Sequence, residues 1–162
     1  MATIKAYLQR AKEVRVNLLD ESENIIIKNE NKIVQLQTSQ IDKGQGSDDQ
    51  ILKNANSIYS GVYQPLTHSY AALGIPSSPI APKNVGDLYN FAWTGAFLSG
   101  LQIQMSSDKL SFLLFSTGTG SGNKKAFFDG YKNLFGLDAK NTTIVNQEIL
   151  YPEILNYLNS KL

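Results

Sequence analysis

A glycine-rich stretch lies between a predicted strand and a predicted helix, where it could bind phosphate. Residues 118–125 read Gly-Thr-Gly-Ser-Gly-Asn-Lys-Lys. Backbone N–H groups of such a loop, together with a helix N-terminus, can hold an anion. The P-loop, however, needs Gly-Lys-Ser/Thr, whereas Asn123 precedes Lys124 here. The dinucleotide fingerprint also fails, because the glycines alternate and the strand belongs to a hairpin. These departures favour a mobile loop.

Acidic residues and glycines are mixed over residues 42–49, as they are in calcium-binding loops. An EF-hand needs oxygen ligands at alternate positions and a glutamate at the twelfth, but residue 53 is a lysine. We therefore expect a solvated turn in which Asp48 or Asp49 caps the following segment. No metal site is expected.

His68 is the only histidine, and the chain has no cysteine. These counts exclude disulfides, thiolate zinc sites, cysteine nucleophiles and a histidine-rich metal centre. Ser69 adjoins His68, but adjacent residues cannot adopt the relay geometry of nucleophilic catalysis. We expect His68 to lie at a surface or an interface, and we expect a protein that is not an enzyme and needs no cofactor.

The eight tyrosines are the remaining group of interest. Tyrosine suits interfaces that have one apolar and one wet side, and it is as often a core residue. Both readings stay open for Tyr59, Tyr63, Tyr70, Tyr89, Tyr151 and Tyr157.

Composition limits the architecture and the partners. The 162 residues (17.9 kDa) are enough for one domain, 1–162, and 42% of them are hydrophobic, enough to build a core. Fifteen lysines and arginines balance 14 acidic residues, which argues against a specific nucleic-acid partner. No apolar stretch approaches the roughly 18 residues that span a bilayer, and Lys5 interrupts any signal-like N-terminus. We expect a soluble protein, made in a cytoplasm, without a membrane partner.

Helix is predicted for residues 3–38, because apolar residues recur every three or four positions. This region is either one long helix or two helices with a break near residue 21. Residues 25–27 are three β-branched isoleucines, which could instead begin a strand. Residues 39–49 are polar and contain glycine, which predicts a turn-rich connection.

Four of the five prolines lie within residues 65–82. Proline density of this kind predicts an extended arm, at about 64–87, rather than a helix or a central strand. Loops of this length commonly serve as functional arms or interface segments, and we expect this one to order only when docked. Its interface candidates are Tyr70, Pro76, Pro79 and Pro82.

An antiparallel hairpin is predicted at about 101–116. Residues 101–105 alternate apolar and amide side chains, and residues 106–109 form a turn. Residues 110–115 are apolar on both faces apart from Ser111, so the second strand should be central or covered by a partner. Leu113 and Phe115 are therefore candidate interface residues.

Two C-terminal helices complete the prediction. The first should open at Asn123 and end near Gly136, which suits a C′ glycine. The second should run from about Asn141 to the end, with a kink or a new start at Pro152. The predicted class is α+β: a long N-terminal helix, a small antiparallel sheet, a proline-rich arm and two C-terminal helices.

Residues 88–103 resemble a motif of tail-completion and neck (head–tail connector) proteins of tailed bacteriophages, especially virion proteins of Bacteroidetes phages. That motif has Asp-Thr-Gly, a few helical residues, a serine and an alternating strand; here Thr94, Gly95 and Ser99 match it, and Trp93 replaces the aspartate. The likeness continues through the N-terminal helix, the Asp/Gly turn, Tyr59-Ser60, the arm and the hairpin. It ends with Phe135-Gly136-Leu137 and the terminal Pro-Glu-Ile-Leu.

The retained motif residues have a structural reading. Thr94 can cap a short helical turn at 96–99, and Gly95 can let the chain reverse close to the sheet. The resemblance implies a virion subunit, made in the host cytoplasm, that forms homo-oligomeric rings and contacts portal-side and tail-side virion proteins. The alternative is a small soluble ligand-binding or regulatory module that uses the glycine loop or the tyrosines.

Overall fold

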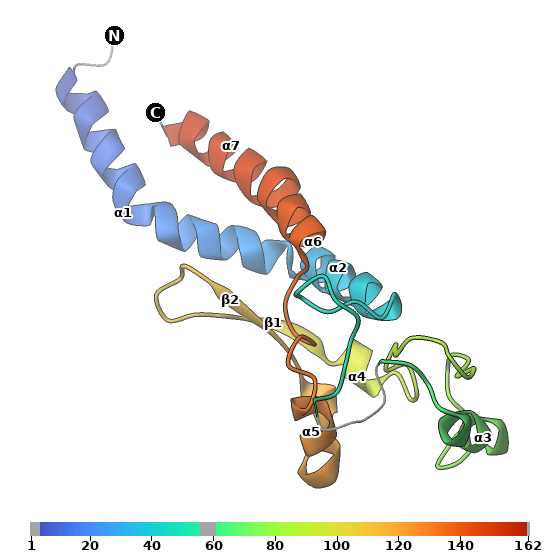
Figure 1. The fold of residues 1–162 in the computed structure, drawn as a ribbon. Coiled ribbons are helices and arrows are strands. Elements are labelled where there is room, and N and C mark those ends of the chain that lie inside the picture. The colour runs from blue at the N-terminus through green and yellow to red at the C-terminus, as the bar shows by residue number, and fades with distance from the viewer. Residues whose placement is uncertain (1–3, 56–60, 162) are drawn as a thin grey trace.

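The computed structural model describes residues 4–55 and 61–161, so Tyr59 and Ser60 lie outside the described residues. Figure 1 shows two layers and a lobe. One layer holds the long N-terminal and C-terminal helices, and the second is a two-stranded antiparallel hairpin. The lobe, beyond the root of the hairpin, holds three short helices. The α+β class and the long N-terminal helix are confirmed.

Helix α1 (Ile4–Lys28) passes residue 21 without a break. The interruption lies at Asn29, whose side-chain amide donates to the Ile25 carbonyl at 2.9 Å, and α2 (Glu30–Asp42) follows directly. The three isoleucines are helical. Ile25 and Ile26 are buried against the C-terminal helix, whereas Ile27 is exposed. Burial of two branched side chains outweighs their preference for a strand.

The C-terminal helix is continuous from Ala139 to Lys161. It consists of α6 (Ala139–Ile144), a π-helical stretch (Val145–Leu150) and α7 (Tyr151–Lys161). Asp138 caps its start, because its carboxylate accepts a hydrogen bond from the Asn141 N–H at 2.7 Å. The helix neither stops nor restarts at Pro152, and the π-helical stretch ends two residues before this proline.

Strands β1 (Leu101–Met105) and β2 (Phe112–Ser116) form the expected hairpin. Its inner face packs on the helical layer. The Glu30 carboxylate also accepts a hydrogen bond from the Ile103 N–H at 2.9 Å. This bond joins α2 to the edge of β1 that faces away from β2. The residues of the inner face are Leu101, Ile103, Met105, Phe112, Leu114 and Ser116, and those of the outer face are Gln102, Gln104, Leu113 and Phe115.

Helix α5 (Gly122–Asp129) ends well before Gly136, so the predicted C′ role of that glycine is wrong. At the end of the helix the Asn54 side chain donates to the Phe127 carbonyl and the Ala55 N–H donates to the Gly130 carbonyl. Two buried glutamines of α2 then bind the non-helical backbone that follows. Gln37 donates to the Leu134 carbonyl and accepts the Gly136 N–H, and Gln40 donates to the Gly136 carbonyl. Gly136 adopts a φ of 119°, which favours glycine.

The sequence predicted an extended proline-rich arm, but part of the arm is helical. It begins with helix α3 (Pro65–Leu73), in which Pro65 occupies the first turn and Gly74 ends the helix with a left-handed φ of 67°. Proline at the first helical position loses no hydrogen bond, so its presence is compatible with a helix. The prolines after residue 74 then keep the remainder of the arm irregular.

Two apolar clusters hold the layers together. One lies in the helical layer and under the hairpin, around Ile25, Ile26, Ile33, Val145 and Ile149. The other joins α2, the root of the hairpin and α5, around Ile41, Leu52, Phe97, Leu101, Phe128, Tyr131 and Leu134. Within the described residues, no helix is long and apolar enough to cross a membrane.

Candidate functional site

The free edge of β2 carries backbone groups that are available for pairing. The Thr117 N–H donates to the Gly100 carbonyl at 3.0 Å, and the Ser106 N–H donates to the Ser111 carbonyl at 2.9 Å. These bonds fix which residue pairs of the hairpin are hydrogen-bonded and which are not. Phe112 and Leu114 belong to non-hydrogen-bonded pairs, so their N–H and C=O groups point away from β1. In the described part of the chain nothing bonds to those groups.

An apolar hollow of about 340 Å³ lies beside this edge, between β2 and the C-terminal helix. Leu113 borders the hollow and is 59% exposed on the outer face, and Phe115 on the same face is half-buried. The hollow is lined by Phe112, Leu113, Leu114, Phe135, Gly136, Leu137, Thr142, Val145, Asn146 and Leu150. An open strand edge with apolar side chains invites pairing with another strand. We refer to the free edge of β2 together with this hollow as the β2 edge.

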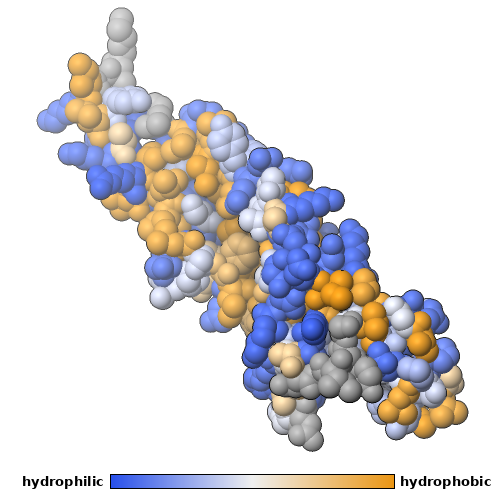
Figure 2. All heavy atoms as spheres, in the orientation of Figure 1, coloured by the Kyte–Doolittle hydropathy of each residue, from blue (hydrophilic) through white to orange (hydrophobic). Residues whose placement is uncertain are grey.

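Helix α3 presents a second uncovered apolar face. Leu66, Tyr70 and Leu73 follow the i, i+4, i+7 spacing and are 64%, 45% and 71% exposed. No residue of α3 is buried. Figure 1 places α3 at the end of the molecule opposite the free end of α1, and Figure 2 shows apolar residues on the surface there, interspersed with polar ones. Tyr70 therefore belongs to a helical face rather than to an extended arm.

The remainder of the arm is attached to the lobe by specific contacts. The Trp93 indole donates to the Ser77 carbonyl at 2.9 Å, and the Ile80 N–H donates to the Trp93 carbonyl at 2.8 Å. Pro76 and Pro82 are exposed, and Pro79 is partly buried. The sequence predicted that the arm orders only when it docks on a partner. It did not predict these contacts between the arm and the lobe of the same chain.

Lys83 is a buried anchor that sequence reasoning missed. It is 3% exposed, and its ammonium donates to the Asn90 side-chain oxygen at 2.8 Å and to the Ala92 carbonyl at 3.2 Å. Burial lowers its pKa, with Asp42 and Asp87 partly opposing that shift. A signal was present in the sequence: between Lys53 and Asp87, Lys83 is the only charged residue.

The motif residues Thr94, Gly95 and Ser99 form a structural turn ahead of α4 (Ala96–Ser99). Gly95 has a left-handed φ of 80°, which is the conformation that its role in chain reversal requires. The cap prediction for Thr94 needs correction, since Gly95 occupies the N-cap position and the Ala96 N–H reaches the Thr94 hydroxyl only at 3.4 Å. Thr94 and Ser99 are both exposed.

We expect Gly95→Val to lower the free energy of unfolding by about 2 kcal/mol, because a branched side chain disfavours positive φ. A Cβ at residue 95 would also lie 3.2 Å from the Ile80 Cδ1 atom. Thr94→Ala is the matched control and should change stability by no more than about 0.5 kcal/mol. Urea unfolding measures both, and equal stability of Gly95→Val and the unaltered protein would contradict the turn.

The glycine-rich stretch is more ordered than the sequence predicted. Residues 117–119 form a 3-10 helix, and the Ser116 hydroxyl accepts the Gly118 N–H at 3.0 Å. Gly118 lies directly on α4: a Cβ there would be 2.0 Å from the Ala96 carbonyl oxygen. This half of the stretch is a packing element, with a 3-10 helix where the sequence predicted a loop.

The acidic turn and His68 serve local contacts. Asp48 accepts hydrogen bonds from the Asn133 side chain at 2.8 Å and the Gln50 N–H at 3.1 Å, and the first of these does most to lower its pKa. Asp49 accepts the Ala139 N–H at 3.2 Å, so it helps to cap α6 rather than the segment after it. His68 is exposed on α3, and its Nδ1 atom lies 3.1 Å from the Lys83 carbonyl oxygen. The described residues contain no group of three potential acidic, histidine or cysteine metal ligands.

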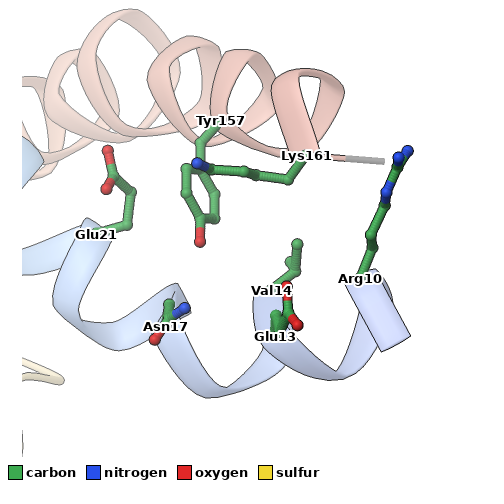
Figure 3. A pocket seen from close by; sticks show the side chains of 7 residues that line it. All are labelled: Arg10, Glu13, Val14, Asn17, Glu21, Tyr157 and Lys161. Carbon is green, nitrogen blue, oxygen red and sulfur yellow. The ribbon is translucent and has the colours of Figure 1, made fainter. Parts of the chain in front are cut away.

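A polar cleft of about 300 Å³ separates α1 from α7 where the two helices diverge (Figure 3). Tyr157 points from α7 toward α1, and the Lys161 ammonium lies 5.8 Å from the Tyr157 ring centre. The charges in the cleft balance, with Arg10 and Lys161 against Glu13 and Glu21, so it does not select a ligand by net charge.

Comparisons of the chain with protein-family models, curated proteins and solved structures give no match.

Proposed function

We propose that this protein is a structural subunit that assembles through strand pairing at the β2 edge. The observation that carries this proposal is that Phe112 and Leu114 present backbone groups that no described residue pairs with, next to an apolar hollow. An extended segment of a neighbouring subunit would satisfy those groups and place every second side chain in the hollow. Such pairing would also cover Leu113.

The assembly we propose is the head–tail connector of a tailed bacteriophage, in which copies form a ring and contact portal-side and tail-side proteins. The sequence resemblance around Thr94 and Gly95 suggests this setting. The exposed face of α3 supports it, because a ring subunit needs contact surfaces besides the one that joins identical copies. Location in the virion is part of the same proposal.

The test is the mass of the purified protein, measured by light scattering, with particle shape observed by electron microscopy. We expect closed rings for the unaltered chain and smaller species for Leu113→Asp, because a carboxylate in the strand interface would be desolvated. Leu110→Asp is the matched control: Leu110 is 72% exposed in the hairpin turn, and it does not line the hollow.

A monomeric unaltered protein at every concentration would overturn homo-oligomeric assembly. Rings that persist in Leu113→Asp would show that the β2 edge is not the contact. Circular dichroism should show the same helical content for both variants, since neither side chain is buried.

A ligand-binding module is the second candidate function. The feature that favours it is an aromatic pocket around Lys83, in the lobe.

A further inference from the structure

An aromatic pocket of about 290 Å³ lies where the arm meets the lobe. Its walls are mostly rings, and several of them contact one another edge to face, such as Tyr63 and Tyr89, whose centres are 5.0 Å apart. The lining residues are Tyr63, Thr67, Lys83, Tyr89, Phe91, Trp93, Phe127 and Phe128. A volume of this size suits a ligand built on a single ring.

Lys83 is the only charged residue of the lining. Its two hydrogen-bond acceptors, on Asn90 and Ala92, are neutral oxygens, and its ammonium lies 5.2 Å from the centre of the Tyr63 ring. Among the described residues no carboxylate lies within 4.0 Å of it, and Asp42 and Asp87 act only from farther away.

A structural role accounts for only part of this arrangement, namely the hydrogen bond from the Lys83 ammonium to the buried Ala92 carbonyl. The Asn90 side-chain oxygen also accepts hydrogen bonds from the Tyr63 hydroxyl at 2.9 Å and from the Ala92 N–H at 3.1 Å. Those two donors hold Asn90 in place without the lysine. A buried ammonium without a carboxylate at ion-pair distance is costly. The charge is therefore best explained by an anion that enters the pocket.

We propose that this pocket binds a small aromatic carboxylate, with the ring between the aromatic walls and the carboxylate at the Lys83 ammonium. The rings favour an aromatic ligand, because offset and edge-to-face contacts add to the burial of apolar surface. The single positive charge selects an anion over a neutral or cationic ring. This site is separate from the β2 edge, so it does not depend on the proposed assembly.

Trp93 makes the site measurable, because it is the only tryptophan and it lines the pocket. Benzoate, benzamide and benzylamine form a charge series on one ring and can be titrated while Trp93 fluorescence is followed. We expect benzoate to bind at least about tenfold more tightly than benzamide, and benzylamine to bind most weakly. Equal binding of the three probes, or no response to benzoate, would overturn the proposal.

Lys83→Met keeps an unbranched side chain and removes the charge, so it should reduce the preference for benzoate over benzamide to within about twofold. Lys140→Met, at an exposed position on α6, is the matched control and should keep the full preference. A Lys83→Met protein that is folded and retains the preference would contradict the assignment. If Lys83→Met does not fold, the charge series on the unaltered protein decides the question.

Discussion

Gln40→Leu is expected to lower the free energy of unfolding by about 3 kcal/mol, because it leaves several buried polar groups without partners. Gln40 is 1% exposed. Its amide donates to the Gly136 carbonyl at 3.0 Å, and its oxygen accepts the Asp138 N–H at 2.8 Å and the Asn141 side-chain amide at 3.2 Å. Leucine can replace none of these bonds. Urea unfolding followed by circular dichroism measures the loss.

The matched control is Gln35→Leu, the same exchange at an exposed position of the same helix. We expect it to change stability by less than about 0.5 kcal/mol, as surface substitutions usually do. If Gln40→Leu proved as stable as Gln35→Leu, the buried network would not hold residues 134–138 against α2.

Gly118→Ala is expected to lower the free energy of unfolding by about 3 kcal/mol, at the upper end of overpacking effects. A Cβ there would meet the Ala96 carbonyl oxygen at 2.0 Å and the Phe97 Cα at 2.6 Å, which are backbone atoms that cannot rotate away. Relief would require the 3-10 helix and α4 to separate. Thermal unfolding and urea unfolding should both show the loss.

Gly122→Ala separates the effect of crowding from that of backbone conformation. Gly122 has a positive φ of 58°, but nothing lies within 4 Å of a Cβ built there. Its substitution should cost only the left-handed conformation, about 1 kcal/mol. Similar losses for both alanine variants would argue against close contact between Gly118 and α4.

Features that depend on neighbours in the chain could be predicted from the sequence. Apolar spacing predicted α1, and alternation over residues 101–105 predicted the hairpin, because each side chain's direction follows from the period of its own element. Gly95 was also predictable as a turn residue, since its positive φ is a local requirement. The outward position of Leu113 follows from the same alternation once the strand is placed.

Features that depend on distant partners could not be predicted in this way. Helix α5 ends at Asp129, where Asn54 and Ala55, more than 70 positions earlier in the chain, donate to the Phe127 and Gly130 carbonyls. Gln37 and Gln40 then bind the backbone of residues 134–138. The periodicity of residues 127–134 carried no trace of those contacts and therefore predicted a longer helix. Gly118 likewise looked flexible, because only the tertiary structure places Ala96 against it.

The sequence by itself determined the α+β class, the long first helix, the hairpin and the turn at Gly95, because local stereochemistry and side-chain period specify them. Tertiary structure alone decided which edge of the hairpin stays open. It also decided that Lys83, the only charged residue between Lys53 and Asp87, is buried among aromatic rings. Glu30 binds one edge of the hairpin and nothing described binds the other. Both outcomes depend on how elements pack across the fold, and packing of that kind leaves no periodic mark in the chain.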